Sequence, residues 1–172
     1  RDWRVRCAAT GLVVLGTESL GAKHLRSLAA LLGDETWQVR LAAVQSLTQL
    51  RALSRPLWGR FAELVEDSGP DVRAAALQAL ASVCDEATLS VHSGVIAGRL
   101  SDKHARVRAA AVRALAKLSS AAVAPHVAAI EHLAKKPHGE AEEEEDQAAA
   151  RAFLSASRSR RRGERTAREI LS

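Results

Sequence analysis

The chain has 172 residues and a formal net charge of +5, with 47% hydrophobic and 26% charged residues. This length allows one ordinary domain or one short repeat array, and the composition excludes a largely disordered chain. No segment alternates with the two-residue period of a strand, and no apolar run approaches the length needed to cross a membrane. Alanine supplies 35 residues and aromatic residues only 3%. Because alanine favours helices but buries little area, we expect thin layers of packed helices.

One phrase occurs four times along the chain. Close copies begin at Val5 (VRCAATGLV), Val39 (VRLAAVQSL), Val72 (VRAAALQAL) and Val107 (VRAAAVRAL), at steps of 34, 33 and 35 residues. In every copy two alanines lie three and four residues after the valine, and another apolar residue lies eight residues after it. Residues at these offsets lie on one face of an α-helix. The copies predict amphipathic helices, called helices B here, near 3–15, 37–52, 70–83 and 105–118, and this period is typical of a solenoid.

A second predicted helix, called helix A, precedes each complete copy. These segments are LRSLAALLGD (25–34), LWGRFAELVED (57–67) and VHSGVIAGRLSD (91–102), and each ends in an aspartate. Aligned on that aspartate, they place large apolar residues in two columns, which are Leu28, Phe61 and Ile96, and Leu32, Val65 and Leu100. One pair of helices cannot bury its apolar stripe alone, whereas stacked pairs can. We therefore expect an array of such pairs over residues 1–136.

The repeated unit resembles the HEAT repeat, in the short form also seen in repeats like those of phycobilisome lyases. An aspartate in the turn is followed five and six residues later by Val-Arg and then by a pair of alanines, over roughly residues 1–135. The resemblance implies an all-α, right-handed α-solenoid of four to five helical pairs. It also implies a ladder of hydrogen bonds between successive repeats, for which the matching pairs are Asp34 with Arg40, Asp67 with Arg73, and Asp102 with Arg108. For Arg6, the matching aspartate would have to lie just before Arg1.

The pattern weakens toward the C-terminus. Residues 119–136 read as a fifth helix A, but Lys136 stands where the turn aspartate is expected. Residues 137–146 contain a proline, a glycine and an acidic run, and we interpret them as an acidic linker. Residues 147–172 then form a charged C-terminal extension, in which 147–157 resemble a degenerate fifth helix B that acts as a cap, followed by an Arg-rich tail.

The tail offers a cluster of arginines, Arg158, Arg160, Arg161 and Arg162. Such a cluster suits an acidic protein surface or the phosphates of a nucleic acid. No aromatic residues lie between these arginines, so stacking on bases is not supported. A solvated or packed tail without a binding role is the third interpretation.

The polar face of the helices B is the second candidate surface. Beside the apolar stripe it carries Gln45 and Gln78 in the earlier repeats, and Arg106, Arg113 and Lys117 in the last complete one. We interpret it as a groove for a protein partner, with a plain solvated surface as the alternative. His24, His92 and His126 share one column of the repeat, but Leu57 stands in the same column, which argues against a metal site.

No motif of a hydrolase, a phosphate-binding loop or a zinc peptidase is present in the sequence. We therefore expect a non-catalytic scaffold or adaptor without a cofactor, which binds protein partners in a larger assembly. One alternative is a nucleic-acid-associated HEAT protein that uses the basic tail. The other is an enzyme on the same fold, such as a bilin lyase or a DNA glycosylase, whose functional residues cannot be placed here.

Overall fold

The computed structural model describes residues 2–15, 22–50, 57–135 and 143–171, and within these ranges all regular secondary structure is helical. In chain order the elements are α1 (Trp3–Leu15), α2 (Ala22–Leu31), α3 (Trp37–Gln49), α4 (Trp58–Leu64), α5 (Pro70–Val83), α6 (Glu86–Val91), α7 (Ser93–Gly98), the 3₁₀ turn η3 (Arg99–Ser101), α8 (Ala105–Leu115), α9 (Ser120–Val123), the 3₁₀ turn η4 (Ala124–His126), α10 (Val127–Lys135) and α11 (Glu143–Leu171). None of the helices in this part of the chain has the length and apolar character that a membrane crossing requires.

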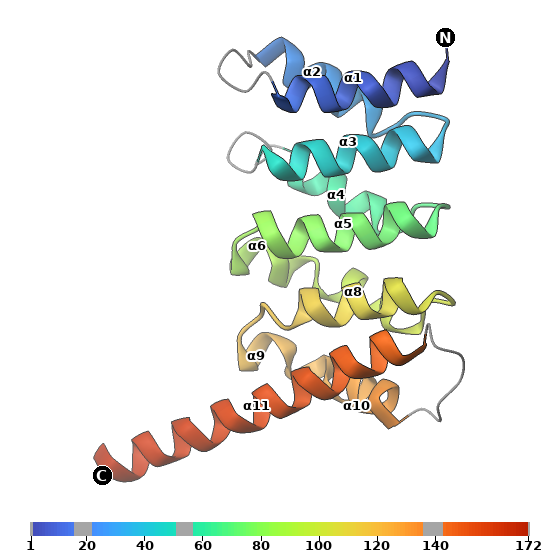
Figure 1. The fold of residues 1–172 in the computed structure, drawn as a ribbon. Helices are drawn as coiled ribbons and strands as arrows, with labels where there is room; N and C mark the ends of the chain where they lie inside the picture. Colours follow the sequence, from blue (N-terminus) through green and yellow to red (C-terminus); the bar gives the residue numbers. More distant parts are fainter. Residues whose placement is uncertain (1, 16–21, 51–56, 136–142, 172) are drawn as a thin grey trace.

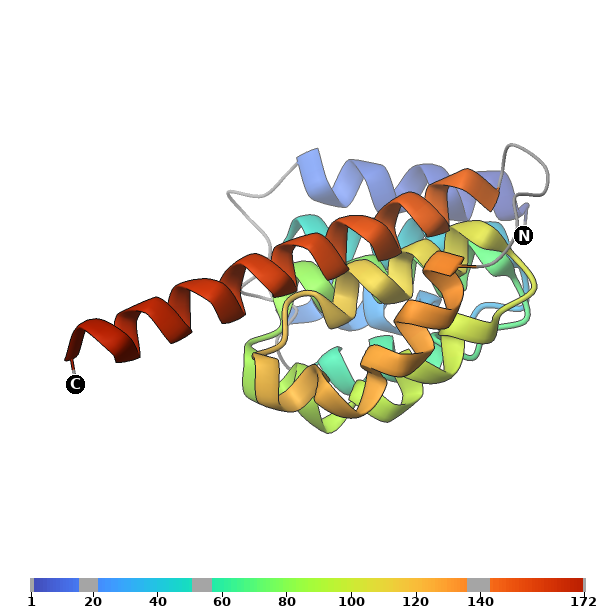
Figure 2. The ribbon, with the colours of Figure 1, turned by 90° about the horizontal axis from the view of Figure 1, so that it is seen from below.

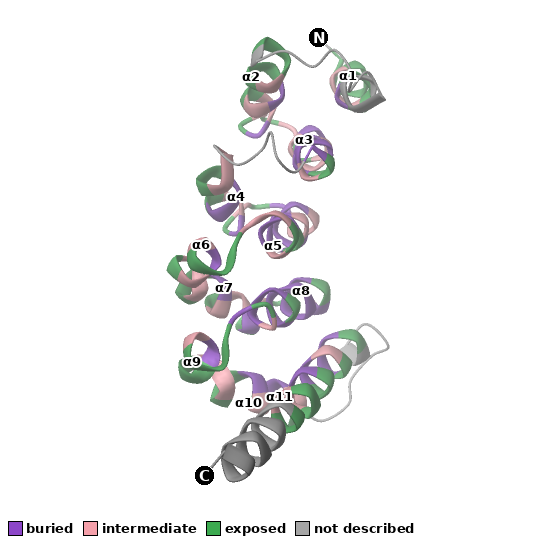
Figure 3. Ribbon diagram, turned by 90° about the vertical axis from the view of Figure 1, so that its left-hand side faces the viewer, coloured by how far each residue is buried: buried purple, intermediate pink, exposed green. Residues whose placement is uncertain are grey.

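The helices form two rows. The helices B, which are α1, α3, α5, α8 and α11, lie side by side in chain order (Figure 1). The shorter helices A form the second row, with α2, α4, α6–α7 and α9–α10 beside the first (Figure 3). The ends of the described chain lie at opposite ends of the stack (Figure 1). The expected all-α solenoid is therefore confirmed.

The core runs along the seam between the two rows. The predicted columns of helix A are buried in every described layer, since Leu28, Phe61 and Ile96 are at most 2% exposed, and Ile130 continues the column in the fifth layer. The valines that begin the phrase in α3, α5 and α8 are fully buried as well. The helices B contribute both alanines and large residues such as Leu47, Leu77 and Leu80 to the same core, in which small side chains allow close packing.

Each turn between helix A and helix B is shaped by its aspartate. The Asp34 Oδ1 accepts a hydrogen bond from the main-chain N–H of Thr36 at 2.9 Å. Asp67 accepts from the N–H of Gly69 at 2.7 Å, and Asp102 from the N–H two residues after it at 3.0 Å. A side chain that binds the main chain two residues on closes a tight turn. In the second of these turns, Pro70 then occupies the first turn of α5, where its missing N–H costs no hydrogen bond.

Two helices A are divided where the sequence predicts one helix. The segment 91–102 spans the end of α6, then α7 and η3, because His92 leaves helical geometry at φ −94° and ψ 4°. Gly94 and Gly98 lower the helix propensity of α7 further. In the fifth helix A, Pro125 lies in η4 between α9 and α10, since a proline ring does not fit the interior of a helix.

The C-terminal part departs most from the sequence interpretation. Helix α11 begins at Glu143, inside the segment expected as the acidic linker 137–146, and continues to Leu171. Acidic residues at a helix N-terminus are stabilised by the helix dipole, which favours this start over a longer linker. The expected cap and Arg-rich tail (147–172) are thus one helix over most of their length, and its C-terminal part extends beyond the stack (Figures 1 and 2).

We expect Phe61→Ala to lower the free energy of unfolding by about 3–5 kcal/mol, because the side chain is fully buried and the surrounding layers cannot close the cavity. Val91 is 80% exposed, so Val91→Ala should change it by no more than about 0.5 kcal/mol. Urea denaturation followed by circular dichroism measures both. If the two substitutions lowered the free energy of unfolding by the same amount, the seam between the two rows would not be the core of the fold.

Candidate partner-binding surface

Arginines of the helices B bind the turn aspartates of the following layer. Arg40 on α3 donates to Asp67 from Nε and Nη2, each at 2.7 Å from a carboxylate oxygen. Arg73 on α5 donates in the same two-pronged way to Asp102, at 2.9 Å for both bonds. The side chains of Arg73 and Asp102 are only 8% and 6% exposed. Paired, two-pronged bonds of this kind are stronger and more directional than single ones.

The side-chain pairs differ from the expectation, because each arginine binds a carboxylate of the following layer and not that of its own turn. Arg6 binds the carboxylate of Asp34 in the following layer, with Nη2 at 2.9 Å from Oδ1 and Nε at 2.7 Å from Oδ2. Arg108 pairs with Asp146, a buried residue in the first turns of α11. The sequence did not single out Asp146, because it lies 38 residues after its arginine, against 27 to 29 in the earlier rungs.

Within one repeat, the arginine side chain binds the main-chain carbonyl oxygen of the aspartate. Nη1 of Arg40 donates to the carbonyl oxygen of Asp34 at 2.8 Å, and Nη1 of Arg73 donates to that of Asp67 at 2.8 Å. Arg108 binds the carbonyl of Asp102 in the same way at 2.9 Å. Arg40 and Arg73 therefore join their own turn to the next one, and Arg108 joins its turn to α11. The ladder residues are thus engaged inside the stack.

Contacts within the ladder lower the pKa of two of its aspartates, Asp34 and Asp102. The hydrogen bond from Arg6 holds the pKa of Asp34 below its ordinary value, with a further contribution from the Thr36 main chain. For Asp102, burial by itself would raise the pKa, but the hydrogen bonds from Arg73 and from the main chain of His104 outweigh it, and the pKa is lowered. Both aspartates are thus bound as carboxylates in the folded chain.

A row of exposed polar side chains crosses the helices B. We call it the helix-B ridge, and it comprises Gln45 on α3, Gln78 on α5, and Arg106, Arg113 and Lys117 on and just after α8, all of them exposed. Counted from the valine of each copy, these residues lie at offsets that fall on one face of a helix. Because α3, α5 and α8 lie side by side, the ridge spans three consecutive layers.

Two of the three basic residues of the ridge are paired within the chain. Arg106 lies 3.1 Å from Asp71 of α5, and Arg113 lies 3.0 Å from Glu145 of α11. All four side chains are 40% exposed or more, so water screens both pairs. Lys117 makes no such pair within the described residues. The basic character expected for this face is therefore concentrated at Lys117.

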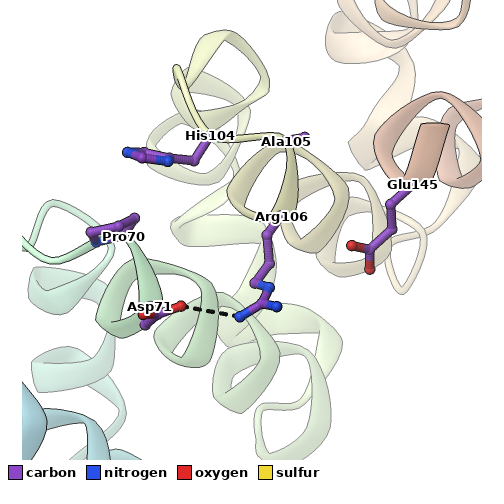
Figure 4. Close-up of a pocket in the computed structure, with 6 residues that line it drawn as sticks. All are labelled: Pro70, Asp71, His104, Ala105, Arg106 and Glu145. Carbon is purple, nitrogen blue, oxygen red and sulfur yellow. Dashed lines mark hydrogen bonds and ion pairs between the residues drawn. The ribbon is translucent and has the colours of Figure 1, made fainter. Parts of the chain in front are cut away.

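A groove of about 310 Å³ opens at one end of the ridge. It is lined by Pro70, Asp71, His104, Ala105, Arg106 and Glu145, and Figure 4 shows Arg106 directed to Asp71 across it. The groove thus presents charges of both signs. No group of three potential metal ligands occurs among the described residues, the histidines of the shared column included.

Part of the Arg-rich tail can be placed. Arg158 is exposed on α11 and lines a smaller cleft of about 90 Å³ with Leu154 and residues of α9 and α10. The main chain of Arg160, Arg161 and Arg162 belongs to α11, but their side chains lie outside the described residues. The tail is thus carried on a helix that begins against α8 and α10.

Comparison with known proteins identifies the chain as a HEAT-repeat protein. A family model described as HEAT repeats matches residues 22–91 and again residues 57–153, together more than half of the chain. The chain is also similar to the crystal structure of an engineered protein from the Northeast Structural Genomics Consortium, with 16% identity and a TM-score of 0.59. That similarity covers 77% of this chain and 63% of the engineered protein, and at this identity it concerns the fold alone. No curated protein matches the chain.

We expect Arg73→Ala to lower the free energy of unfolding by about 3–5 kcal/mol, because it leaves the carboxylate of Asp102 buried without its partner. Arg106→Ala removes an ion pair whose side chains are 69% and 40% exposed, so it should cost about 1 kcal/mol or less. Urea denaturation of the two variants makes the comparison. A loss for Arg73→Ala as small as that for Arg106→Ala would show that the ladder does not hold the layers together.

The lowered pKa values predict how stability depends on pH. An aspartate whose folded pKa lies below its unfolded value of about 3.9 stabilises the fold fully above that value, and the contribution is lost as pH falls through the folded pKa. The double variant Asp34→Asn and Asp102→Asn should therefore be less stable than the native chain at pH 7, with the difference narrowing below about pH 4. Urea midpoints measured from pH 7 to pH 2 check this, and a constant difference over that range would refute it.

Proposed function

Because the chain belongs to the HEAT-repeat family, we propose that it is a non-catalytic scaffold that binds a protein partner along the helix-B ridge, as one component of a larger assembly. The observation that carries the proposal is the contrast between two sets of polar residues. The arginines and aspartates of the ladder are bound to each other between layers, whereas the ridge residues remain exposed over three neighbouring helices.

The chemistry of the ridge favours a polar partner with an acidic part. Gln45 and Gln78 offer amide groups that both donate and accept hydrogen bonds. Lys117 adds a positive charge near the end of α8, and the pairs made by Arg106 and Arg113 keep much of their surface open to solvent. An extended partner segment that lies across α3, α5 and α8 would reach all of these groups, with an acidic residue at Lys117.

Helix α11 supports a second candidate function. It carries seven arginines from Arg151 onward against two glutamates, and its C-terminal part extends beyond the stack (Figure 2). A basic helix of this kind can bind the phosphates of a nucleic acid, with an affinity that falls steeply as salt rises. Removal of the residues after Ser157 would abolish such binding and leave the ridge in place.

The ridge is tested by the triple variant Gln45→Glu, Gln78→Glu and Lys117→Glu. We expect it to weaken capture of the partner by the immobilised chain at least about tenfold, because an acidic partner would then face like charges. The unfolding midpoint should stay the same, since all three side chains are exposed. Quantitative mass spectrometry of the captured proteins gives the measurement.

The matched control is the double variant Lys23→Glu and Lys135→Glu. It lowers the net charge by the same amount through exposed residues of α2 and α10, on the other row of helices. Equal loss of the partner in both variants would point to net charge alone and refute the ridge. Loss only on truncation after Ser157, with salt-sensitive recovery of nucleic acid, would favour the second function.

A further inference from the structure

The helix A of the fourth layer, formed by α6 and α7, has an apolar outward face. Val91 is 80% exposed and Val95 is 41% exposed. Gly94 and Gly98 are exposed as well, and the spacing of the four residues is that of one face of a helix. We call these four residues the α6–α7 face.

This face lies within the array and not at one of its ends. Figure 3 shows α6 and α7 in the row of helices A, with α4 on one side and α9 and α10 on the other. Counted from the turn aspartate, the equivalent positions of the two preceding helices A carry exposed polar side chains, which are Lys23 and Ser27 on α2 and Arg60 and Glu63 on α4. The apolar outward face is therefore a property of the fourth layer and does not follow from the repeat.

No contact within the described chain requires the two glycines of the face. No glycine among the described residues has a positive φ. A Cβ added at Gly94 or at Gly98 would meet no atom within 4 Å. Both glycines nonetheless weaken α7 relative to alanine. Because glycine lets another chain approach the backbone closely, the two positions are suited to receive side chains from outside.

The two ends of the face carry opposite charges. Glu86 is exposed in the first turn of α6, and Lys103 is exposed just after η3. The Glu86 Oε1 accepts a hydrogen bond from the main-chain N–H of Ser119 at 2.8 Å. Lys103 makes no ion pair within the part of the chain that the structure describes. An antiparallel copy of the same segment would thus offer each end a charge of the opposite sign.

We propose that the α6–α7 face pairs with the α6–α7 face of a second copy of the chain, in an antiparallel arrangement about a twofold axis between Gly94 and Val95. Each valine then lies over a glycine of the other copy, Val91 over Gly98 and Val95 over Gly94. Glu86 of each copy faces Lys103 of the other. Such a twofold interface uses one self-complementary surface on both copies. It goes beyond the proposed function, since it uses the row of helices A and not the helix-B ridge.

A parallel arrangement of the two copies fits less well. It would place Val91 against Val91 and Gly98 against Gly98, which leaves voids at the glycines. It would also bring Glu86 against Glu86, and like charges across an interface are unfavourable. A stable interface buries roughly 800 Å² on each partner, whereas this face spans two short helices, so we expect a weak and reversible dimer.

The test is sedimentation equilibrium of the full chain from about 10 μM to about 1 mM, over which the average mass of the native chain should rise. Gly98→Gln should lower the association constant at least about tenfold, because the new side chain occupies the space that Val91 of the second copy would fill. The unfolding midpoint should not fall, since this position is open and glutamine favours a helix more than glycine does.

Two further comparisons identify the occupant. Gly11→Gln makes the same change at an exposed glycine of α1 that also has open space around it, and it should leave the association constant unchanged. Lys103→Glu should lower the constant by about threefold, because two acidic groups then face each other. Adding Glu86→Lys to Lys103→Glu should restore it, and this recovery is expected only if the two residues meet across two copies.

Three results would overturn the proposal: a native chain that stays monomeric to about 1 mM, association unaffected by Gly98→Gln, or no recovery in the charge-reversed variant. A monomeric chain that loses a captured protein through Gly98→Gln would overturn it in favour of a different protein on this face. The triple variant of the ridge keeps the α6–α7 face, so it should associate as the native chain does. The failure of either proposal therefore leaves the other standing.

Discussion

The architecture depends on one joint, in which a buried arginine connects two consecutive layers. Arg73 shows the arrangement in full, since it donates to the carbonyl oxygen of Asp67 in its own turn and to both carboxylate oxygens of Asp102 in the next. A buried charge without such partners would be costly, so the joint forms only when neighbouring layers have the correct register. The apolar seam supplies most of the stabilising burial, and the ladder fixes how one layer is placed on another.

Because the joints are local, the two ends of the stack differ. At the C-terminal end, Asp146 on α11 completes the last rung, and the outer side of α11 is exposed at Arg151, Ala152 and Ser155. At the other end, Val5, Ala8 and Ala9 of α1 are exposed, whereas the matching valines of the inner layers are fully buried. The polar face that this packing leaves uncovered is the surface on which we propose that a partner binds.

Residue spacing predicts the repeated parts of this structure well and the irregular parts poorly. The columns of Leu28, Phe61 and Ile96 follow from helical periodicity, because each side chain meets the same environment in each layer. Asp146 was missed because it belongs to a helix and not to a turn, which removes the periodic signal. For the ridge, the sequence identified exposed positions, but the pairs of Arg106 and Arg113 depend on α5 and α11 and require the packing of the layers to be known.

A double-mutant cycle measures the central joint most directly. With Arg73→Ala and Asp102→Ala, the coupling in the free energy of unfolding should be about 1–3 kcal/mol, because the two side chains bind each other across layers. With Arg73→Ala and Asp67→Ala, the coupling should be close to zero, since Arg73 binds the main-chain carbonyl of Asp67, which alanine retains. Stronger coupling within the repeat than between repeats would contradict the account.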